Sequence, residues 1–284
     1  FTGDIQKMYR QILVHKSDRK YQQILFRTED KNPVEAFQLK TVTFGVNCAP
    51  FLAIRTLQEL SKDCKNIYPK ASAILQNEIY VDDVLSGGHT LEEAKVKQEQ
   101  VFKALKSAGF PFKKITANRT FLLEHLPRED LLDEDFLKFD DSSTIKTLGI
   151  RWNAMADYFY YVVEPIQSLP STTKRKILSV IARLFDPLGW LGPIVIIAKL
   201  MMQELWEEKS DWDEVVPPRI LNKWNVFIEN LPYISDIKIP RWINFAPHYH
   251  KQLHGFCDAS EKAYCGMVYM RTESLLDFYV HIIE

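Results

Sequence analysis

The sequence predicts an α+β fold, because two kinds of hydrophobic periodicity occur along the chain. Apolar residues recur at every second position in some segments, as in half-buried strands, and at helical spacing in others. Strands are expected at residues 36–44, 147–153, 158–163, 253–258 and 266–270, with two short strands joined by a tight turn at 73–85. Helices are expected at residues 51–66, from Thr90 to about Ser107, from a cap at Ser171 or Thr172 to Phe185, and from Pro193 to Glu208.

Local signals set the ends of these elements. Thr90, followed by Glu93 three residues later, forms a capping box that begins a helix. Gly109 and Pro111 are typical of residues that end one. Pro193 suits the first turn of the last helix. Residues 124–143 are acidic and are expected to form a loop.

The most apolar run, residues 188–202, is interrupted by Gly192, Pro193 and Lys199. A membrane span needs about 20 largely apolar residues. We therefore expect a buried helix here and no membrane association.

The composition is that of an ordinary globular protein. The chain has 284 residues, 46% of them hydrophobic and 26% charged, and this length suits about two domains. The first residue is Phe1 rather than Met, so we interpret the chain as part of a longer polyprotein; no secretory signal opens it. The four cysteines form no CxxC pair, which favours reduced thiols in an intracellular protein.

The charge distribution gives little information about ligands. The net charge of −1 argues against an indiscriminate nucleic-acid binder, although Lys and Arg outnumber Asp and Glu within residues 1–120. This basic part could hold a phosphate backbone. Two solvated faces are the alternative, and the charge distribution alone favours that alternative.

Two adjacent carboxylates, Asp82 and Asp83, interrupt an apolar strand segment that reads YVDD at 80–83. Burying such charges is costly without a cation or another partner. One interpretation is a strand turn that presents them to a metal, with Tyr80 and Val81 packed beneath. A solvent-exposed β-turn is the other.

Asp4 becomes informative only if the fold brings it beside Asp82. Two divalent ions about 3.5–4 Å apart need carboxylates from more than one strand. We therefore expect the carboxylates of Asp4 and Asp82 to converge and bridge two ions, with Asp83 supporting the site.

Five segments, in this order, resemble motifs A to E of reverse transcriptases. They are DIQKMY at 4–9, TFGVNCAP at 43–50, YVDD at 80–83, AGFPFKK at 108–114 and LGIRW at 148–152. The resemblance implies a palm with an antiparallel sheet backed by helices and with part of the fingers inserted between Asp4 and Gly45. It implies template-directed transfer from a dNTP to a primer 3′-OH, with two Mg²⁺ ions or with Mn²⁺ in their place.

Later segments resemble the Bel/Pao type of LTR retrotransposon polymerase. They are KRKILSV at 174–180, FDPLG at 185–189, AKL at 198–200, QELW at 203–206 and DWD at 211–213. The resemblance therefore covers essentially the whole chain.

The resemblance implies a role for each matching residue. Asp4, Asp82 and Asp83 would hold the metal ions. Lys114, or its neighbour Lys113, would be the motif D lysine that assists the departure of pyrophosphate; a plain surface lysine is the alternative.

Substrate contacts are implied in the same way. Tyr9 would be the steric gate against a ribonucleotide 2′-OH, and a core aromatic is the alternative. Phe44, Gly45, Pro50 and Tyr80 would contact or shape the nucleotide site, although Phe44 departs from the Gln of retroviral enzymes. Simple turn chemistry also explains the glycine and the proline.

Nucleic-acid contacts are implied further along. Leu148 and Gly149 would belong to the primer grip. Lys174, Arg175 and Lys176 would reach duplex phosphates from a thumb helix.

Residues 253–260, LHGFCDAS, resemble the first strand of a retroelement RNase H, with Asp258 as its first catalytic carboxylate. An Asp that ends a strand is the alternative. The chain stops at Glu284, before the remaining acids of that family, so we expect that this fragment does not cut RNA alone and that the fragment as a whole is inactive by itself.

The implied domains are a palm with partial fingers and primer grip at 1–164, a helical thumb and connection at 165–250, and a truncated RNase H start at 251–284. The implied partners are an RNA or DNA template with its primer, dNTPs, and the protease, RNase H remainder and integrase of the polyprotein. The implied location is intracellular, either a cytoplasmic virus-like particle or the nucleus. An inactive or domesticated nucleic-acid-binding protein is the rival hypothesis, and an unrelated two-metal nuclease is a second.

Overall fold

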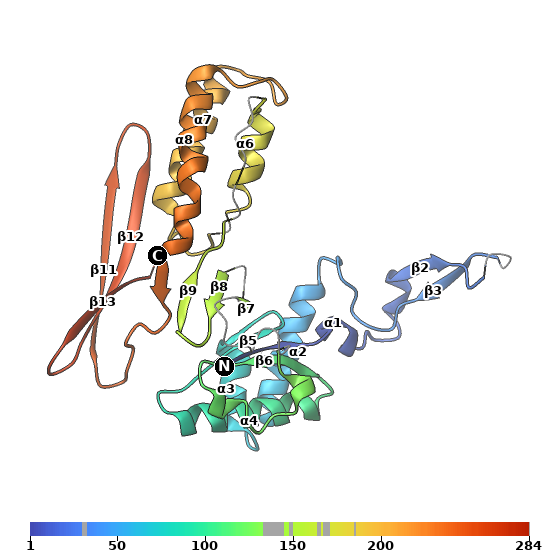
Figure 1. The fold of residues 1–284 in the computed structure, drawn as a ribbon. Coiled ribbons are helices and arrows are strands. Elements are labelled where there is room, and N and C mark those ends of the chain that lie inside the picture. Colours follow the sequence, from blue (N-terminus) through green and yellow to red (C-terminus); the bar gives the residue numbers. More distant parts are fainter. Residues whose placement is uncertain are drawn as a thin grey trace. The chain divides into compact units, whose positions relative to one another are not determined.

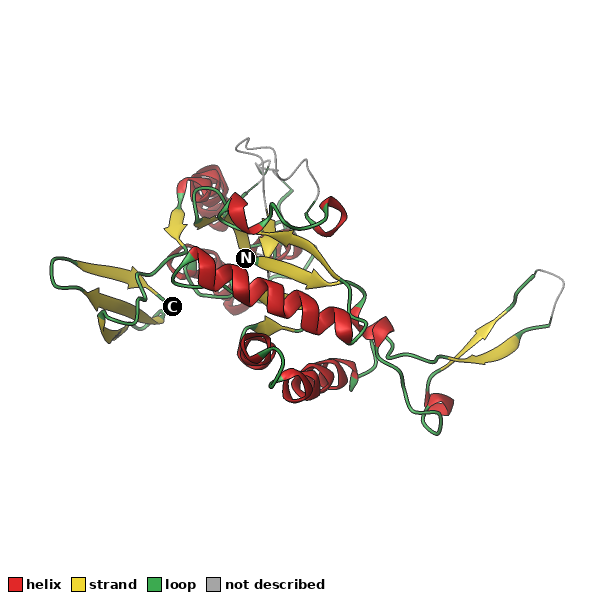
Figure 2. Cartoon of the chain, turned by 90° about the horizontal axis from the view of Figure 1, so that it is seen from below, coloured by secondary structure: helices red, strands yellow, loops and turns green. Residues whose placement is uncertain are grey.

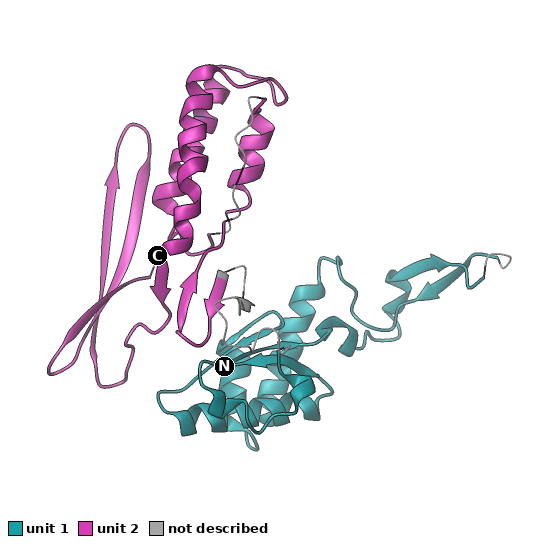
Figure 3. Cartoon of the chain, in the orientation of Figure 1, with its two compact units in different colours: residues 1–143 teal, residues 144–284 magenta. Residues whose placement is uncertain are grey.

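The computed structural model describes residues 1–29, 33–132, 145–147, 150–163, 166, 171–184 and 186–283. The chain forms two compact units, Phe1–Ser143 and Thr144–Glu284 (Figure 3). Helices and antiparallel sheets occur in both units, which confirms the α+β class. Figure 2 shows the helices and strands of the chain in different colours.

A four-stranded antiparallel sheet forms the centre of unit 1. Its strand order is β4-β5-β1-β6, with β1 at Thr2–Ile5, β4 at Ile79–Tyr80, β5 at Asp83–Leu85 and β6 at Phe112–Thr116. The sheet thus pairs the start of the chain with segments that lie far from it in the sequence.

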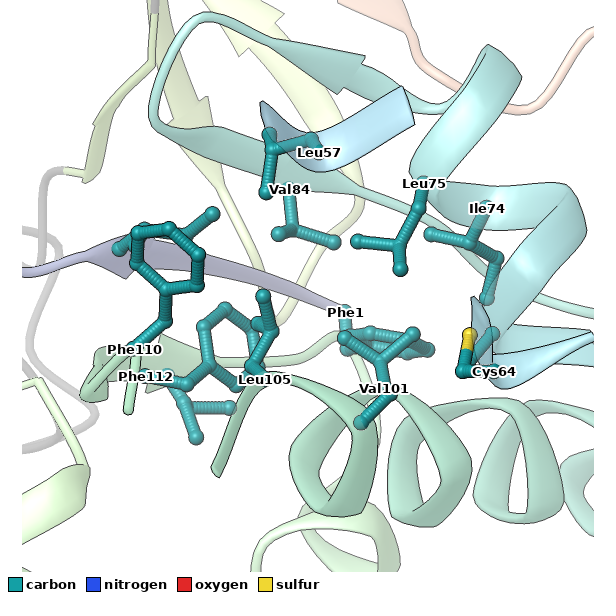
Figure 4. Close-up of a cluster of buried hydrophobic side chains, with 14 of the residues drawn as sticks. Phe1, Leu57, Cys64, Ile74, Leu75, Val84, Val101, Leu105, Phe110 and Phe112 are labelled. Carbon is teal, nitrogen blue, oxygen red and sulfur yellow. The ribbon is translucent and has the colours of Figure 1, made fainter. Parts of the chain in front are cut away.

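Helices pack against this sheet to form the core of unit 1. They are α1 (Met8–Gln11), α2 (Ala49–Cys64), α3 (Pro69–Asn77) and α4 (Leu91–Ser107), with short 3₁₀ turns η1 (Arg19–Tyr21), η2 (Thr120–Leu122) and η3 (Arg128–Asp130). Figure 4 shows apolar side chains from three of the helices meeting those of the strands; among them are Leu57, Ile74, Val84, Val101, Leu105 and Phe112. This packing holds the strands in register.

The α4 prediction is confirmed in detail. Thr90 is the N-cap, and its hydroxyl accepts a hydrogen bond of 3.1 Å from the backbone N–H of Glu93. The Glu93 carboxylate accepts one of 3.0 Å from the backbone N–H of His89. The side chains of Thr90 and Glu93 therefore each accept a hydrogen bond from a backbone N–H group at the start of the helix.

The two short strands predicted at 73–85 are present as β4 and β5, but the first begins only at Ile79. Residues up to Asn77 belong to α3, which begins with Pro69 and buries Ala71, Ile74 and Leu75. A short apolar run does not distinguish a strand from a buried helix, and the proline at the start favours the helix. The tight turn between β4 and β5 is confirmed.

The strand expected at 36–44 is shorter and more exposed than predicted. Strand β3 covers Glu35–Gln38 and pairs with β2 (Gln23–Phe26), and every residue of both strands is exposed. The hairpin extends away from the central sheet of its unit in both views (Figures 1 and 2).

A second four-stranded antiparallel sheet opens unit 2. Its order is β10-β9-β8-β7, with β7 at Ile145–Thr147, β8 at Ile150–Asn153, β9 at Tyr158–Tyr160 and β10 at Lys238–Pro240. The expected strand pair is present, and β10 joins it from far along the chain. The compact units therefore divide before this sheet, whereas the predicted domains divide after it.

The helices of unit 2 are α6 (Lys174–Ile181), α7 (Gly192–Glu207) and α8 (Pro218–Asn230), followed by η4 (Leu231–Asp236). Helix α6 is capped by Thr173, not by Ser171 or Thr172, and is shorter than predicted. Helix α7 is the expected buried helix, with Ala198, Met201, Met202 and Leu205 in the core. Among the residues described, no helix combines the length and apolar character needed to cross a membrane.

A three-stranded antiparallel sheet ends the chain, in the order β11-β12-β13. Its strands are β11 (His250–Ala259), β12 (Tyr264–Glu273) and β13 (Phe278–Ile282). The two predicted strands are confirmed and are longer than expected, whereas β13 was not predicted.

Two residues of α4 test the packing of unit 1. Leu105 is fully buried in the core, whereas Val96 is 42% exposed. Leu105→Ala should lower the free energy of unfolding by about 2–5 kcal/mol because it leaves a cavity. Val96→Ala should stay within about 0.5 kcal/mol. Urea unfolding of the two variants measures both values, and equal losses would contradict this description of the core.

Candidate active site

The pairing of β1 with β5 brings two of the predicted carboxylates together. Asp4 lies directly opposite Asp83 in the antiparallel register, and Ile5 N donates a hydrogen bond of 2.8 Å to the carbonyl oxygen of Asp82. Directly opposed residues present their side chains on the same face of a sheet. Asp4 and Asp83 therefore share a face, beside the turn that carries Asp82.

The turn between β4 and β5 consists of Val81 and Asp82, because Tyr80 pairs with Asp83. Val81 has a φ of 57°, in the left-handed region that a β-branched residue adopts only at a cost. Tyr80 is 60% exposed, so it does not pack beneath the turn as expected. Val84, which follows Asp83 in β5 and pairs with Ile79, is fully buried.

The surroundings of Asp4 and Asp83 disfavour the ionised form of both carboxylates. Burial raises the pKa of Asp4, the ammonium of Lys114 opposes this rise, and the negative charge of Asp82 adds to it. Burial also raises the pKa of Asp83, and Asp82 and Asp4 raise it further. Ionised aspartates at this position therefore repel one another, and a bound cation would relieve the repulsion.

Lys114 supplies a positive charge to this cluster. Its Nζ lies 3.6 Å from Asp4 Oδ2, whereas Lys113 forms ion pairs with Asp130 and Glu129. Of the two lysines considered from the sequence, Lys114 is the one whose ammonium lies beside the Asp4 carboxylate.

The donor set fits a hard divalent cation in its chemistry. Carboxylate oxygens are the ligands that Mg²⁺ and Mn²⁺ prefer, and Asp4, Asp82 and Asp83 supply them from two adjacent strands and their turn. Among the described residues, no three His, Cys, Asp or Glu side chains are already grouped as metal ligands. The carboxylates would have to move closer together around an ion.

Tyr9, the predicted steric gate, contacts Phe44, which is predicted to lie at the nucleotide site. Tyr9 lies in α1 and packs partly against the core, and its ring meets that of Phe44 edge-to-face with centroids 4.7 Å apart. Phe44 is 61% exposed. Gly45 follows with a φ of 83°, which disfavours any side chain, and Pro50 stands in the first turn of α2. The rings of Tyr9 and Phe44 thus bring the predicted motif A and motif B segments into contact.

Lys174 does not have the position expected of a phosphate ligand. Its side chain is buried, and its ammonium lies 5.2 Å from the ring centroids of both Trp206 and Trp212. The prediction that Lys174 reaches phosphates needs correction, because cation–π contacts hold this charge inside unit 2.

The neighbouring cations also have partners within the chain. Arg175 forms a bidentate ion pair with Asp213, with distances of 2.8 and 2.9 Å, and Lys176 donates a hydrogen bond of 2.9 Å to the carbonyl oxygen of Ser171. Both residues lie at the surface, so their exposed groups could exchange these partners for a phosphate.

The remaining predicted residues fall in unit 2. Asp258 lies near the end of β11, opposite Cys265, and its carboxylate accepts a hydrogen bond of 2.9 Å from the N–H of Ala259. Leu148 and Gly149 lie outside the described residues, between β7 and β8.

One residue of interest was not found from the sequence. Asp130 is 5% exposed and pairs with Lys113 beside the site. It falls in the acidic segment that was predicted to be a loop, and no local pattern there marks one acid as buried.

Comparison with known families decides the identity of the chain. Residues 1–151 match the family described as reverse transcriptase (RNA-dependent DNA polymerase). The chain belongs to this reverse transcriptase family. Residues 173–283 match the Pao retrotransposon-like RNaseH-like domain, so this reverse transcriptase is of the Bel/Pao type. No curated protein matches the chain.

The two matches overlap the predicted domains but do not test the function predicted for each. The reverse transcriptase match ends in β8, and the RNaseH-like match runs from the cap of α6 through β13. The functional assignments of residues 1–164, 165–250 and 251–284 stay predictions.

Because the carboxylates of this reverse transcriptase repel one another, we expect that removing one of them increases stability in a pH-dependent way. A raised folded-state pKa means that stability is fully present below the ordinary aspartate pKa of about 3.9 and is lost as the pH rises through the folded value. Without divalent ions, Asp83→Asn should therefore raise the melting temperature at pH 7 by about 1–3 °C, and the gain should shrink towards pH 4. Glu124→Gln, at an exposed position of unit 1, is the matched control. A gain that is independent of pH would contradict the assigned cause.

Proposed function

We propose that unit 1 transfers a nucleotide from a dNTP to the 3′-OH of a primer on an RNA or DNA template. Asp4, Asp82 and Asp83 would hold two Mg²⁺ ions, with Mn²⁺ as a substitute. The observation that carries the proposal is the opposition of Asp4 and Asp83 on paired strands beside the Asp82 turn.

The bound ions would lower the pKa of the primer hydroxyl and neutralise the triphosphate and the leaving pyrophosphate. The chain itself supplies position and charge. β1 and β5 fix the carboxylates relative to each other, and the raised pKa values of Asp4 and Asp83 support a site that gains from binding a cation.

Lys114 would act on the leaving group. Its ammonium stands beside Asp4 and is close enough to the proposed metal site to donate a proton, or simply positive charge, to pyrophosphate. Such general acid assistance typically contributes a factor of about 10²–10⁴ to a rate.

Tyr9 would exclude ribonucleotides. The ring contact with Phe44 supports this role, because it limits the freedom of the Tyr9 ring at the proposed sugar position. Gly45 and Pro50 would shape the loop that contacts the base pair, and Tyr80 would contact the primer end from its exposed position.

Unit 2 would hold the nucleic acid. We assign Leu148 and Gly149 to a primer grip, Arg175 and Lys176 to duplex phosphates, and Asp258 to the first acid of an RNase H site. A palm with partial fingers, a helical thumb and the start of an RNase H domain are the finer fold assignments that go with these roles. The other partners would be the protease, integrase and remaining RNase H of a polyprotein, in a cytoplasmic particle or the nucleus.

The first test concerns Asp82 in the polymerase that contains this chain. Asp82→Asn should reduce primer extension on the order of a thousandfold, because about 4 kcal/mol of transition-state stabilisation is lost. Circular dichroism and the melting temperature should show an intact fold. A loss below tenfold in folded enzyme would refute the metal-binding role and favour the rival hypothesis of a nucleic-acid-binding protein that does not polymerise.

The second test concerns sugar selection by Tyr9. Tyr9→Val or Tyr9→Ala should raise the efficiency of ribonucleotide incorporation relative to deoxyribonucleotide incorporation, because the ring no longer blocks the 2′-OH. The ratio of the two values of kcat/KM is the measurement, since loss of folded enzyme cancels from it. If Tyr9 is only a packing residue, truncation costs up to about 3–5 kcal/mol of stability and the ratio stays unchanged.

A further inference from the structure

The strand that carries Lys114 contains an irregularity beside Asp4. In the pairing of β1 with β6, Thr2 faces Thr116 and Asp4 faces Lys113, so β6 holds one more residue than β1 between these pairs. Lys114 lies in this interval with a φ of 51°. A bulge of this kind re-aims side chains, and here it brings Lys114 Nζ to 3.6 Å from Asp4 Oδ2.

The register gives Asp4 two lysine neighbours. Lys113 is directly opposite Asp4, and opposed residues share a face of the sheet. Without another partner, the ammonium of Lys113 would therefore compete with Lys114 and with metal ions for the Asp4 carboxylate.

Asp130 gives Lys113 that other partner. The Asp130 carboxylate is buried and forms a close ion pair with Lys113 Nζ, and this hydrogen bond raises the pKa of Lys113. Glu129, whose side chain is 80% exposed, lies 3.4 Å from the same nitrogen. A buried charge that loses its partner is strongly disfavoured, so Asp130 holds Lys113 firmly, whereas Glu129 contributes little.

The backbone fixes Asp130 next to the bulge. Leu131 forms a bridge with Ile115, and Leu132 N donates a hydrogen bond of 3.1 Å to the Ile115 carbonyl oxygen. Ile115 is fully buried. The segment after η3 is thus bound to Ile115, the residue after Lys114, while Asp130 pairs with Lys113, the residue before it.

We propose that Asp130 is a positioning residue that keeps Lys113 away from Asp4, so that Lys114 alone faces the metal-binding carboxylates. This inference rests on the proposed function, because it assumes that Asp4 binds a metal ion during polymerisation. It predicts that loss of Asp130 impairs the site through Lys113 and not through loss of fold.

The test compares Asp130→Ala with Glu129→Ala in the polymerase that contains this chain. Asp130→Ala should raise the Mg²⁺ concentration for half-maximal primer extension by about threefold to tenfold, the effect expected of a competing ion pair at a partly exposed carboxylate. It should also reduce the rise in melting temperature that Mg²⁺ produces without substrates. Glu129→Ala should behave as the unsubstituted enzyme in both measurements.

A second substitution separates positioning from simple destabilisation. Adding Lys113→Met to Asp130→Ala removes the competing ammonium and should restore the Mg²⁺ requirement to within about twofold of the unsubstituted enzyme. If Asp130→Ala does not fold, Asp130→Asn keeps the volume and removes the charge, and the same pair of measurements applies.

Two results would overturn the proposal. One is an unchanged Mg²⁺ requirement in folded Asp130→Ala enzyme, and the other is a raised requirement that Lys113→Met does not reverse. Failure of the proposed function gives a different result, because Asp82→Asn would then leave primer extension nearly intact.

Discussion

The antiparallel pairing of β1 with β5 is the interaction on which the site depends, because it sets like charges opposite each other. Asp4 and Asp83 are partly desolvated and repel one another and Asp82. Such a pairing persists only if packing elsewhere offsets the repulsion. Ile5 and Val84, on the same two strands, are fully buried in the core of unit 1. The apolar layer therefore keeps the carboxylates together before any cation binds.

Backbone strain in unit 1 is concentrated around the same carboxylates. Among the described residues of that unit, the non-glycine positions with positive φ are Lys7, Val81 and Lys114. Lys7 begins the helix that carries Tyr9, Val81 forms the turn before Asp82, and Lys114 lies at the bulge beside Asp4. Residues persist in this conformation only where their surroundings impose it. The irregular backbone at Lys114 accompanies the contact of its side chain with Asp4.

The sequence predicted that Asp4 would lie beside the Asp82–Asp83 turn because these residues stand in recognisable local motifs, and it predicted α4 because Thr90 and Glu93 form a local cap. It did not predict the burial of Lys174 or of Asp130. Lys174 contacts the rings of Trp206 and Trp212, which come from later segments of the chain. Asp130 is buried beside β6, where its neighbour Leu131 forms a bridge with Ile115 and its own carboxylate pairs with Lys113. Charges whose partners come from distant segments carry no local pattern, so only the fold identifies them.

The cation beside Asp4 is a lysine, and its chemistry suits the metal site that we propose for this carboxylate. An ammonium is a single point charge on a flexible stem, whereas a guanidinium would bind the Asp4 carboxylate with two parallel hydrogen bonds. The distance of 3.6 Å between Lys114 Nζ and Asp4 Oδ2 is that of a loose ion pair. Such a pair lowers the repulsion among the carboxylates while leaving their oxygens free to bind an ion. In the proposed reaction, the same flexible stem would let Lys114 turn from Asp4 to the leaving pyrophosphate.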